Sequence, residues 1–152
     1  MDIVEFARRV SRIDTAGRIG LVLKERVSLA NAVIKDKWHL KLYWEEGASG
    51  AVAAALNRYF HDAKVSRETG AHAVYLAILL WRIGEVRHHM LHGAATYCVS
   101  KNRDSVKAAV GLLQPVVPCF FDLLYGDAGR ATKDTWPPVP KPRAGSLQNL
   151  DG

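Results

Sequence analysis

The sequence predicts an all-α protein, a single helical bundle of about five or six helices followed by a disordered C-terminal tail. Apolar residues recur at helical spacing along most of the chain, and strict alternation of apolar and polar residues is scarce. The 152 residues, 49% of them hydrophobic, are enough for one domain with a core and too few for two. We therefore expect a helical bundle over residues 1–125 and a tail over residues 126–152.

The first helices are predicted from caps and apolar periods. A helix fits residues 2–12, with Asp2 as its N-cap. A second helix fits residues 16–34, in which the apolar side chains approximate one stripe: Ile19, Leu23, Val27, Leu29 and Val33. Residues 35–50 are compatible both with an irregular link and with a helix.

Start and stop signals divide the middle of the chain. Ser49 or Gly50 opens a helix that reaches about residue 63, and Ser66 caps the next helix. That helix contains the most apolar run of the chain and is expected to bend at Gly93. The sequence therefore predicts two helices over residues 50–92.

The last helices are expected between residues 94 and 125. Pro115 and Pro118 lie inside the final apolar segment, so a kink or a break is predicted there. From residue 126 onward Gly, Pro, Lys, Arg and Ser dominate without a period, which indicates disorder or an extended peptide.

Charge and cysteine content indicate the environment of the protein. A net charge of +6 favours polyanionic partners such as RNA, DNA or an acidic protein. Cys98 and Cys119 lie in apolar periodic segments without disulfide or metal spacing, which predicts buried free thiols in a reducing cytosol. No secretory signal is visible, and no run is expected to approach the roughly 18 residues of a membrane span. The sequence thus predicts a cytoplasmic protein without a membrane partner.

The helix predicted after Ser66 changes character along its length. One face carries the apolar stripe expected in the core: Leu76, Leu79, Leu80, Ile83, Val86 and Met90. The opposite face of the first half carries Val74, Ile78 and Trp81, so this half is expected to be buried on all sides. In the second half the opposite face becomes polar: Glu85, His88, His89 and His92. We therefore expect the helix to leave the core and enter a polar cleft or a subunit interface, with Arg87 near the edge of the apolar stripe.

The segment RHHMLHG, from Arg87 to Gly93, resembles the signature of the HEPN domains (higher eukaryotes and prokaryotes nucleotide-binding), in which a histidine follows an arginine after four to six residues. His88 occupies the position that is polar in the family, and Gly93 follows His92 as a small residue often does. A second match to the spacing, Arg67 to His72, begins a helix without polar surroundings and is the weaker candidate.

The resemblance implies an all-helical, metal-independent endoribonuclease with a toxin or antiviral-defence role. It also implies a homodimer whose paired motifs build one cleft, and an antitoxin or another defence-system protein as a partner. One subgroup of the family carries a tyrosine two residues after the histidine, where this chain has Ala94. Regulation by modification of such a tyrosine is therefore not expected, because Tyr97 is poorly placed to replace it.

The motif residues suit the cleavage of RNA without a metal or another cofactor. Histidine exchanges protons near neutral pH, and arginine binds phosphate oxygens through a planar, permanent charge. We expect His92 to be the general acid or base and Arg87 to hold the phosphate, with Glu85, His88 or His89 orienting them. Arg87 and His92 lie ~140° apart around a straight helix, so they would converge across a two-fold axis between two chains.

Two other functions fit the same residues. His88 and His92 lie four residues apart, and with Glu85 and His89 they could hold zinc or another transition metal, although no other cluster completes the coordination shell. The protein could also be a non-catalytic helical module that binds nucleic acid or protein.

A basic aromatic segment is a further candidate RNA-binding region. Lys37, Trp38 and Lys41, with neighbouring aromatic residues, could stack on bases and bind phosphates. The alternative for these side chains is a packed corner of the bundle.

Overall fold

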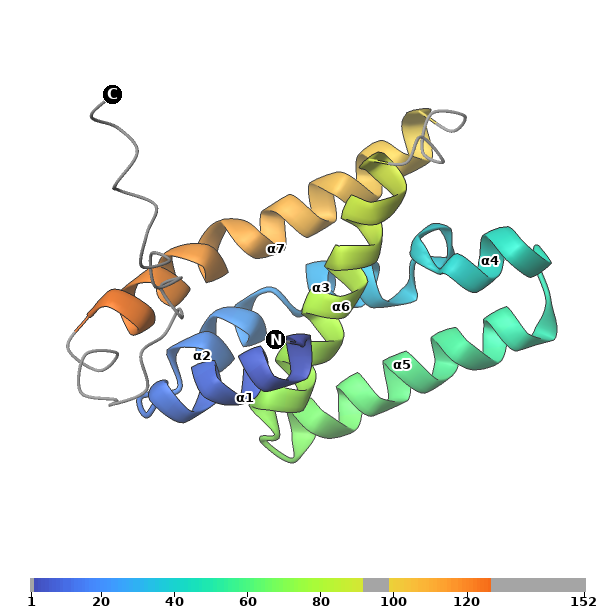
Figure 1. Ribbon diagram of the computed structural model, residues 1–152. Helices are drawn as coiled ribbons and strands as arrows, with labels where there is room; N and C mark the ends of the chain where they lie inside the picture. The colour runs from blue at the N-terminus through green and yellow to red at the C-terminus, as the bar shows by residue number, and fades with distance from the viewer. Residues whose placement is uncertain (1, 92–98, 127–152) are drawn as a thin grey trace, which may run out of the picture.

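The computed structural model describes residues 2–91 and 99–126, which form seven α-helices and one short 3-10 helix without a strand (Figure 1). In chain order these are α1 (Ile3–Ile13), α2 (Arg18–Glu25), α3 (Val27–Lys35), η1 (Lys37–His39), α4 (Lys41–Glu46), α5 (Gly50–Glu68), α6 (His72–Leu91) and α7 (Val99–Tyr125). The all-α prediction is confirmed. Apart from Gly126, the predicted tail lies outside the described residues, as do the expected bend at Gly93 and the predicted thiol of Cys98.

Helix α6 is the central element of the bundle. It packs most extensively against α1 and α5, and it also contacts α3 and α7. In Figure 1 it runs between the α1–α2 pair and the α4–α5 pair, while α7 crosses the molecule beside α2 and α3. The residues that this helix presents at its free surfaces are therefore flanked by α1 on one side and by α4 and α5 on the other.

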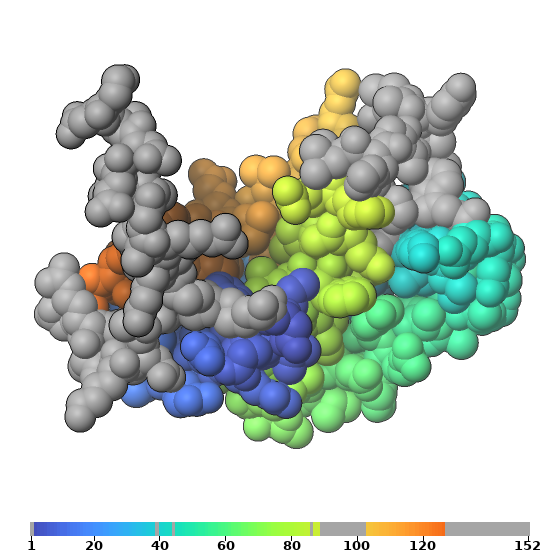
Figure 2. Space-filling model, viewed as in Figure 1, coloured from blue at the N-terminus to red at the C-terminus, as the bar shows by residue number. Residues whose placement is uncertain are grey.

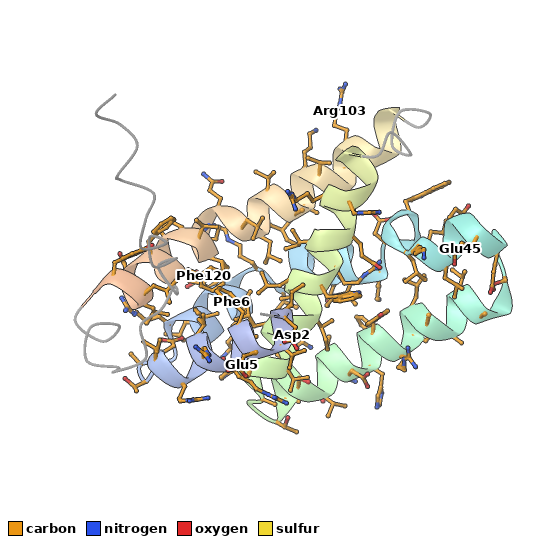
Figure 3. The ribbon with its side chains drawn as sticks, in the orientation of Figure 1. Asp2, Glu5, Phe6, Glu45, Arg103 and Phe120 are labelled. Carbon is orange, nitrogen blue, oxygen red and sulfur yellow. The ribbon has the colours of Figure 1, made fainter. Side chains whose placement is uncertain are left out.

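The core draws apolar side chains from most of the helices. Its fully buried members include Val10, Leu23, Ile34, Leu76, Leu79, Leu112 and Leu123. Phe6 of α1 packs edge-to-face on Phe120 of α7, with ring centroids 5.4 Å apart (Figure 3). Because each buried leucine stabilises the fold by about 1.5–3 kcal/mol, these contacts fix α1, α6 and α7 relative to one another.

The N-terminus of α1 confirms the predicted cap. The Asp2 carboxylate accepts a hydrogen bond of 2.7 Å from the Glu5 backbone N–H, and both residues are labelled in Figure 3. This bond satisfies one of the backbone donors that lack an intrahelical partner in the first turn. Ser49 caps α5 in the same way, since its hydroxyl accepts from the Val52 backbone N–H at 3.3 Å.

The predicted single helix over residues 16–34 is wrong, because α2 and α3 are separate. The chain breaks at Arg26, whose φ of −111° and ψ of 24° are not helical. The break changes the direction of the buried face: α2 packs against α7, whereas α3 packs against α5, α6 and α7. Helical periodicity alone does not detect such a change of partner.

Ser66 is buried inside α5, so the prediction that it caps the next helix is also wrong. Helix α5 continues to Glu68, and the chain turns at Gly70, whose φ of +72° lies in the left-handed region. Glycine adopts this conformation without the steric cost that a Cβ would add. The α5–α6 boundary is therefore set by Gly70.

Helix α7 runs through Pro115 and Pro118, so of the two predicted alternatives, a kink or a break, the break does not occur. Each proline removes one backbone hydrogen bond, but buried side chains on both sides of the prolines hold the helix together: Leu112, Val116 and Leu123.

The part of α7 from Arg103 to Tyr125 is long and apolar enough to cross a membrane by length and composition. The prediction that no run approaches that length is therefore wrong, because the charged residues of α7 lie near its two ends.

Candidate nucleic-acid interface on α6

The two faces of α6 differ in burial. Leu76 and Leu79 on the predicted core face are buried, and Leu80 and Ile83 are half-buried, while the side chains of Val86 and Met90 lie outside the described residues. On the opposite face Val74 is 51% exposed and Trp81 is 50% exposed. The prediction that the first half of this helix is buried on all sides is therefore wrong.

Two adjoining hollows follow this exposed face. The first, of about 240 Å³, is apolar and is lined by residues of α1, α5 and α6: Ile3, Val4, Tyr59, Val74, Ala77, Ile78 and Trp81. The second, of about 210 Å³, is lined by Ile3, Lys41, Trp81, Gly84, Glu85 and His88, and we call it the Trp81 pocket. Ile3 and Trp81 line both hollows, so the two lie next to each other, and we call the pair the depression.

The Trp81 pocket brings together two regions that lie far apart in the sequence. Lys41 belongs to the basic aromatic segment, whereas Glu85 and His88 belong to the polar end of α6. Figure 2 shows the surface of α6 between α1 and the α4–α5 pair. Three of the residues predicted to belong to the functional site thus line the same pocket.

Glu85 is positioned by an arginine that is completely buried. Arg82 has an exposed fraction of 0%, and its Nη1 donates to the Glu85 carboxylate at 2.6 Å. Its Nη2 donates to the backbone carbonyl of Asp36 at 2.5 Å, and its guanidinium carbon lies 5.6 Å from the centroid of the Tyr59 ring. Burial lowers the pKa of Arg82 from its ordinary value, and the Glu85 carboxylate opposes that shift.

Asp36 extends this network to two more elements. Its carboxylate accepts a hydrogen bond of 3.0 Å from the Trp38 backbone N–H at the start of η1. It also accepts a hydrogen bond from the Ser105 hydroxyl of α7. Hydrogen bonds of Arg82, Asp36 and Ser105 therefore join α6, η1 and α7, and Arg82 connects them to Glu85 of the Trp81 pocket. We did not predict these three residues to be important, although a charged residue inside the most apolar run of the chain is a signal for Arg82.

Arg87 has the opposite environment. Its side chain is exposed, and it forms no ion pair within the described part of the chain. His88, the next residue, is also exposed and lines the Trp81 pocket. The side chain of His89 and the whole of His92 lie outside the described residues. The convergence of Arg87 with His92 therefore stays a prediction.

The basic aromatic segment is partly packed and partly exposed. The rings of Trp38 and Tyr43 meet edge-to-face with centroids 5.0 Å apart, and the Lys37 ammonium lies 5.3 Å and 5.4 Å from those centroids. Such contacts are typical of a packed corner of the bundle, and the RNA-binding role of Lys37, Trp38 and Lys41 stays a prediction. Lys41 is exposed and pairs with Glu45 at 3.2 Å, but an exposed ion pair of this kind contributes little stability and leaves the lysine accessible to a ligand.

Among the described residues, no group of three or more His, Cys, Asp or Glu side chains could hold a metal ion. The ligand set considered from the sequence includes His92 and the side chain of His89, which lie outside those residues. The metal-binding alternative therefore stays a prediction.

No family model, no characterised protein and no solved structure matches this chain. The resemblance to the HEPN domains is therefore carried by the sequence motif from Arg87 to Gly93, of which Arg87 to Leu91 form the end of α6.

Proposed function

We propose that the protein is a cytoplasmic, metal-independent endoribonuclease of HEPN type that acts as a homodimer in a toxin or antiviral-defence role. The observation that supports this function best is the shared lining of the Trp81 pocket by Lys41, Glu85 and His88. Arg87 is exposed immediately before His88 on the same helix. A cation, an imidazole and a carboxylate thus line one pocket on a basic protein.

These groups match the chemical needs of RNA cleavage. The 2′-hydroxyl must lose a proton as it attacks the phosphorus, and the 5′-oxygen must gain a proton as it leaves. In the proposed mechanism His92 transfers one of these protons, and Arg87 stabilises the negative charge that develops on the phosphate. The products then carry a 2′,3′-cyclic phosphate and a 5′-hydroxyl, and no metal is required.

The exposure of Arg87 supports its proposed role. Within the described part of the chain the Arg87 guanidinium forms no ion pair, so it can donate two parallel hydrogen bonds to a phosphate. Arg82 is unsuited to this role, because its guanidinium is buried and binds Glu85 and the Asp36 carbonyl. Arg87 is therefore the better candidate of the two arginines of α6.

The homodimer follows from the helical positions of the motif. On a straight helix Arg87 and His92 would lie ~140° apart and would converge poorly within one chain. A two-fold axis near the C-terminal end of α6 would place Arg87 of each chain near the histidine of the other. The mass of the protein in solution tests this part of the proposal.

Cleavage of mixed-sequence RNA in EDTA tests the catalytic role. We expect wild type to cleave, and Arg87→Ala and His92→Ala each to be slower by roughly 10²–10³-fold. Arg58→Ala and His61→Ala are matched controls, because both residues are exposed and neither lines the Trp81 pocket. Equal activity in wild type and both motif variants would refute the proposal.

The main alternative is a non-catalytic module that binds nucleic acid or protein. The apolar hollow beside the Trp81 pocket favours this class, because exposed Val74 and Trp81 form a surface suited to association. RNA binding without EDTA-resistant cleavage would support the module. Stoichiometric metal in protein purified without a histidine tag would instead support the metal-binding alternative.

A further inference from the structure

Half of the surface of Trp81 is exposed, although this residue belongs to the central helix of the bundle. Tyr75, the other aromatic residue in the described part of this helix, is buried in the core. Burying an indole in the core contributes free energy to folding, and the exposed part of Trp81 does not make this contribution. A ligand that covers the ring would gain the corresponding free energy on binding. The ring lines both hollows of the depression and is accessible to a molecule that enters either one.

The walls of the Trp81 pocket limit the chemistry of that ligand. Trp81 and Ile3 give the pocket an apolar surface, and Lys41 supplies a cation from α4. Glu85 and His88 add a carboxylate and an imidazole from the next turns of α6. A ligand that satisfies all of these groups has a flat apolar body, a polar edge and a nearby negative charge.

A nucleotide with an unpaired base has these three properties. Its base stacks on aromatic rings, the amino and imino groups of its edge donate to carboxylates, and its phosphate attracts lysine. An apolar peptide side chain or a lipid tail would fit the neighbouring hollow and would gain nothing from Lys41 or Glu85. The charges of the Trp81 pocket therefore favour the nucleotide.

We propose that the Trp81 pocket is a base-binding subsite, in which Trp81 stacks on one unpaired base of a nucleic-acid strand and Lys41 binds the adjacent phosphate. Glu85, held in place by Arg82 at 2.6 Å, faces the edge of the base. This subsite rests on the proposed function in one respect only: the strand that it binds is taken to be the RNA that Arg87 holds for cleavage. The subsite would require at least one unpaired base beside the bond that is cut.

Binding of a fluorescent single-stranded RNA of mixed sequence tests this subsite. The measurements use the full chain with His92→Ala, so that the RNA is not cleaved. We expect Trp81→Leu and Trp81→Ala to weaken binding by roughly 5- to 150-fold, because each removes one base–aromatic stack. Trp81→Phe keeps an aromatic face and is expected to bind within a few-fold of the parent.

Val74→Ala is the matched control. Val74 is as exposed as Trp81 and lies on the same face of α6, but it lines the apolar hollow and not the Trp81 pocket. We expect its RNA affinity to equal that of the parent. A fully paired duplex of the same sequence is expected to bind equally well to the parent and to Trp81→Leu. Far-UV circular dichroism of each variant establishes that it is folded.

The possible outcomes separate the subsite from the proposed function. If the parent protein binds no RNA, both proposals fail. If it binds RNA and Trp81→Leu binds equally well, the subsite alone is wrong. Binding that depends on Trp81 in a protein that never cleaves RNA supports the subsite and refutes the ribonuclease. A Trp81→Leu variant that changes mass in solution without losing RNA affinity makes the depression a protein interface and overturns the subsite.

Discussion

Arg82 and Arg87 lie five residues apart on the same helix and have opposite environments. Arg82 is fully buried and donates hydrogen bonds to Glu85 and to the Asp36 carbonyl. Arg87 is exposed and has no ion pair among the described residues. The first arginine can therefore be assigned a structural role, whereas the second is available to a ligand.

The contrast follows from where α6 leaves the core. Near Arg82 the helix is enclosed by η1, α5 and α7, so a charge there needs partners that replace water. At Arg87 the side chain reaches solvent, although it lies only 20° from the buried Leu76 around the helix axis by ~100° steps. Position along the helix, and not the face alone, thus decides burial.

A second arginine–glutamate pair provides a reference for the buried one. Arg9 Nε lies 2.7 Å from the Glu5 carboxylate, and both side chains are more than a third exposed. The Arg82–Glu85 distance is nearly the same, but the exposed fractions there are 0% and 19%. The two pairs therefore differ mainly in their access to water, which determines what each contributes to stability.

Among these substitutions, the removal of Arg82 should cause the largest loss of folding stability. We expect Arg82→Met to lower the free energy of unfolding by about 3–5 kcal/mol, because Glu85 and the Asp36 carbonyl lose a donor in a low-dielectric site. Urea denaturation followed by circular dichroism measures the loss. The double variant Arg82→Met/Glu85→Met should be more stable than the single variant, since it no longer leaves one carboxylate without its cation.

Arg87→Ala is the control on the same helix. Its free energy of unfolding should stay within about 0.5 kcal/mol of wild type, because the side chain is exposed. Equal destabilisation by the two substitutions would contradict the division into a structural and a ligand-binding arginine.

A smaller loss is expected for Ser105→Ala. The variant removes the hydroxyl that donates to Asp36 from α7, and the loss of a hydrogen bond to a charged group costs about 1–3 kcal/mol. The same urea experiment measures it, with Ser28→Ala on the exposed side of α3 as the matched control. Unchanged stability of Ser105→Ala would mean that the hydrogen bond from Ser105 to Asp36 does not hold α7 in place.

The smallest change in folding stability is expected for the exposed Arg9–Glu5 pair. The hydrogen bond from Arg9 lowers the pKa of Glu5 below its ordinary value of 4.5, so the stabilisation is present above that value and is lost as the pH falls through the lowered pKa. Glu5→Gln should therefore shift the urea midpoint only slightly at neutral pH, and the difference from wild type should vanish in acid. Added salt should reduce it as well. A difference that persists in acid would show that the carboxylate charge is not its cause.

The helical fold could be predicted from local features. Asp2 and Ser49 act as caps as expected, because a capping bond involves only residues within one turn. Leu76 and Leu79 are buried as the apolar period of α6 predicted. The break at Arg26 and the continuity of α7 through Pro115 could not be predicted in this way, because both depend on which helices pack against those segments.

The candidate site could be predicted only in part. Lys41, Glu85 and His88 were proposed from residue type and spacing, but nothing in the order of the residues indicates that Lys41 and α6 line one pocket. Trp81 was expected to be buried, because a helix that is apolar on all sides is usually enclosed. Its exposure results from the spacing of α1, α4 and α5 around that face, which is a property of the assembled bundle.

The sequence by itself determined that the chain is helical, that α1 and α5 begin at their caps, and that the segment from Arg87 to His92 carries an arginine–histidine motif among polar residues. Those properties depend on interactions within a few turns of one helix. Only the tertiary structure decided which arginine is buried, which tryptophan is exposed and which lysine meets the motif. These depend on contacts between segments as far apart as Asp36, Arg82 and Ser105, whose hydrogen bonds form only when the helices are packed together.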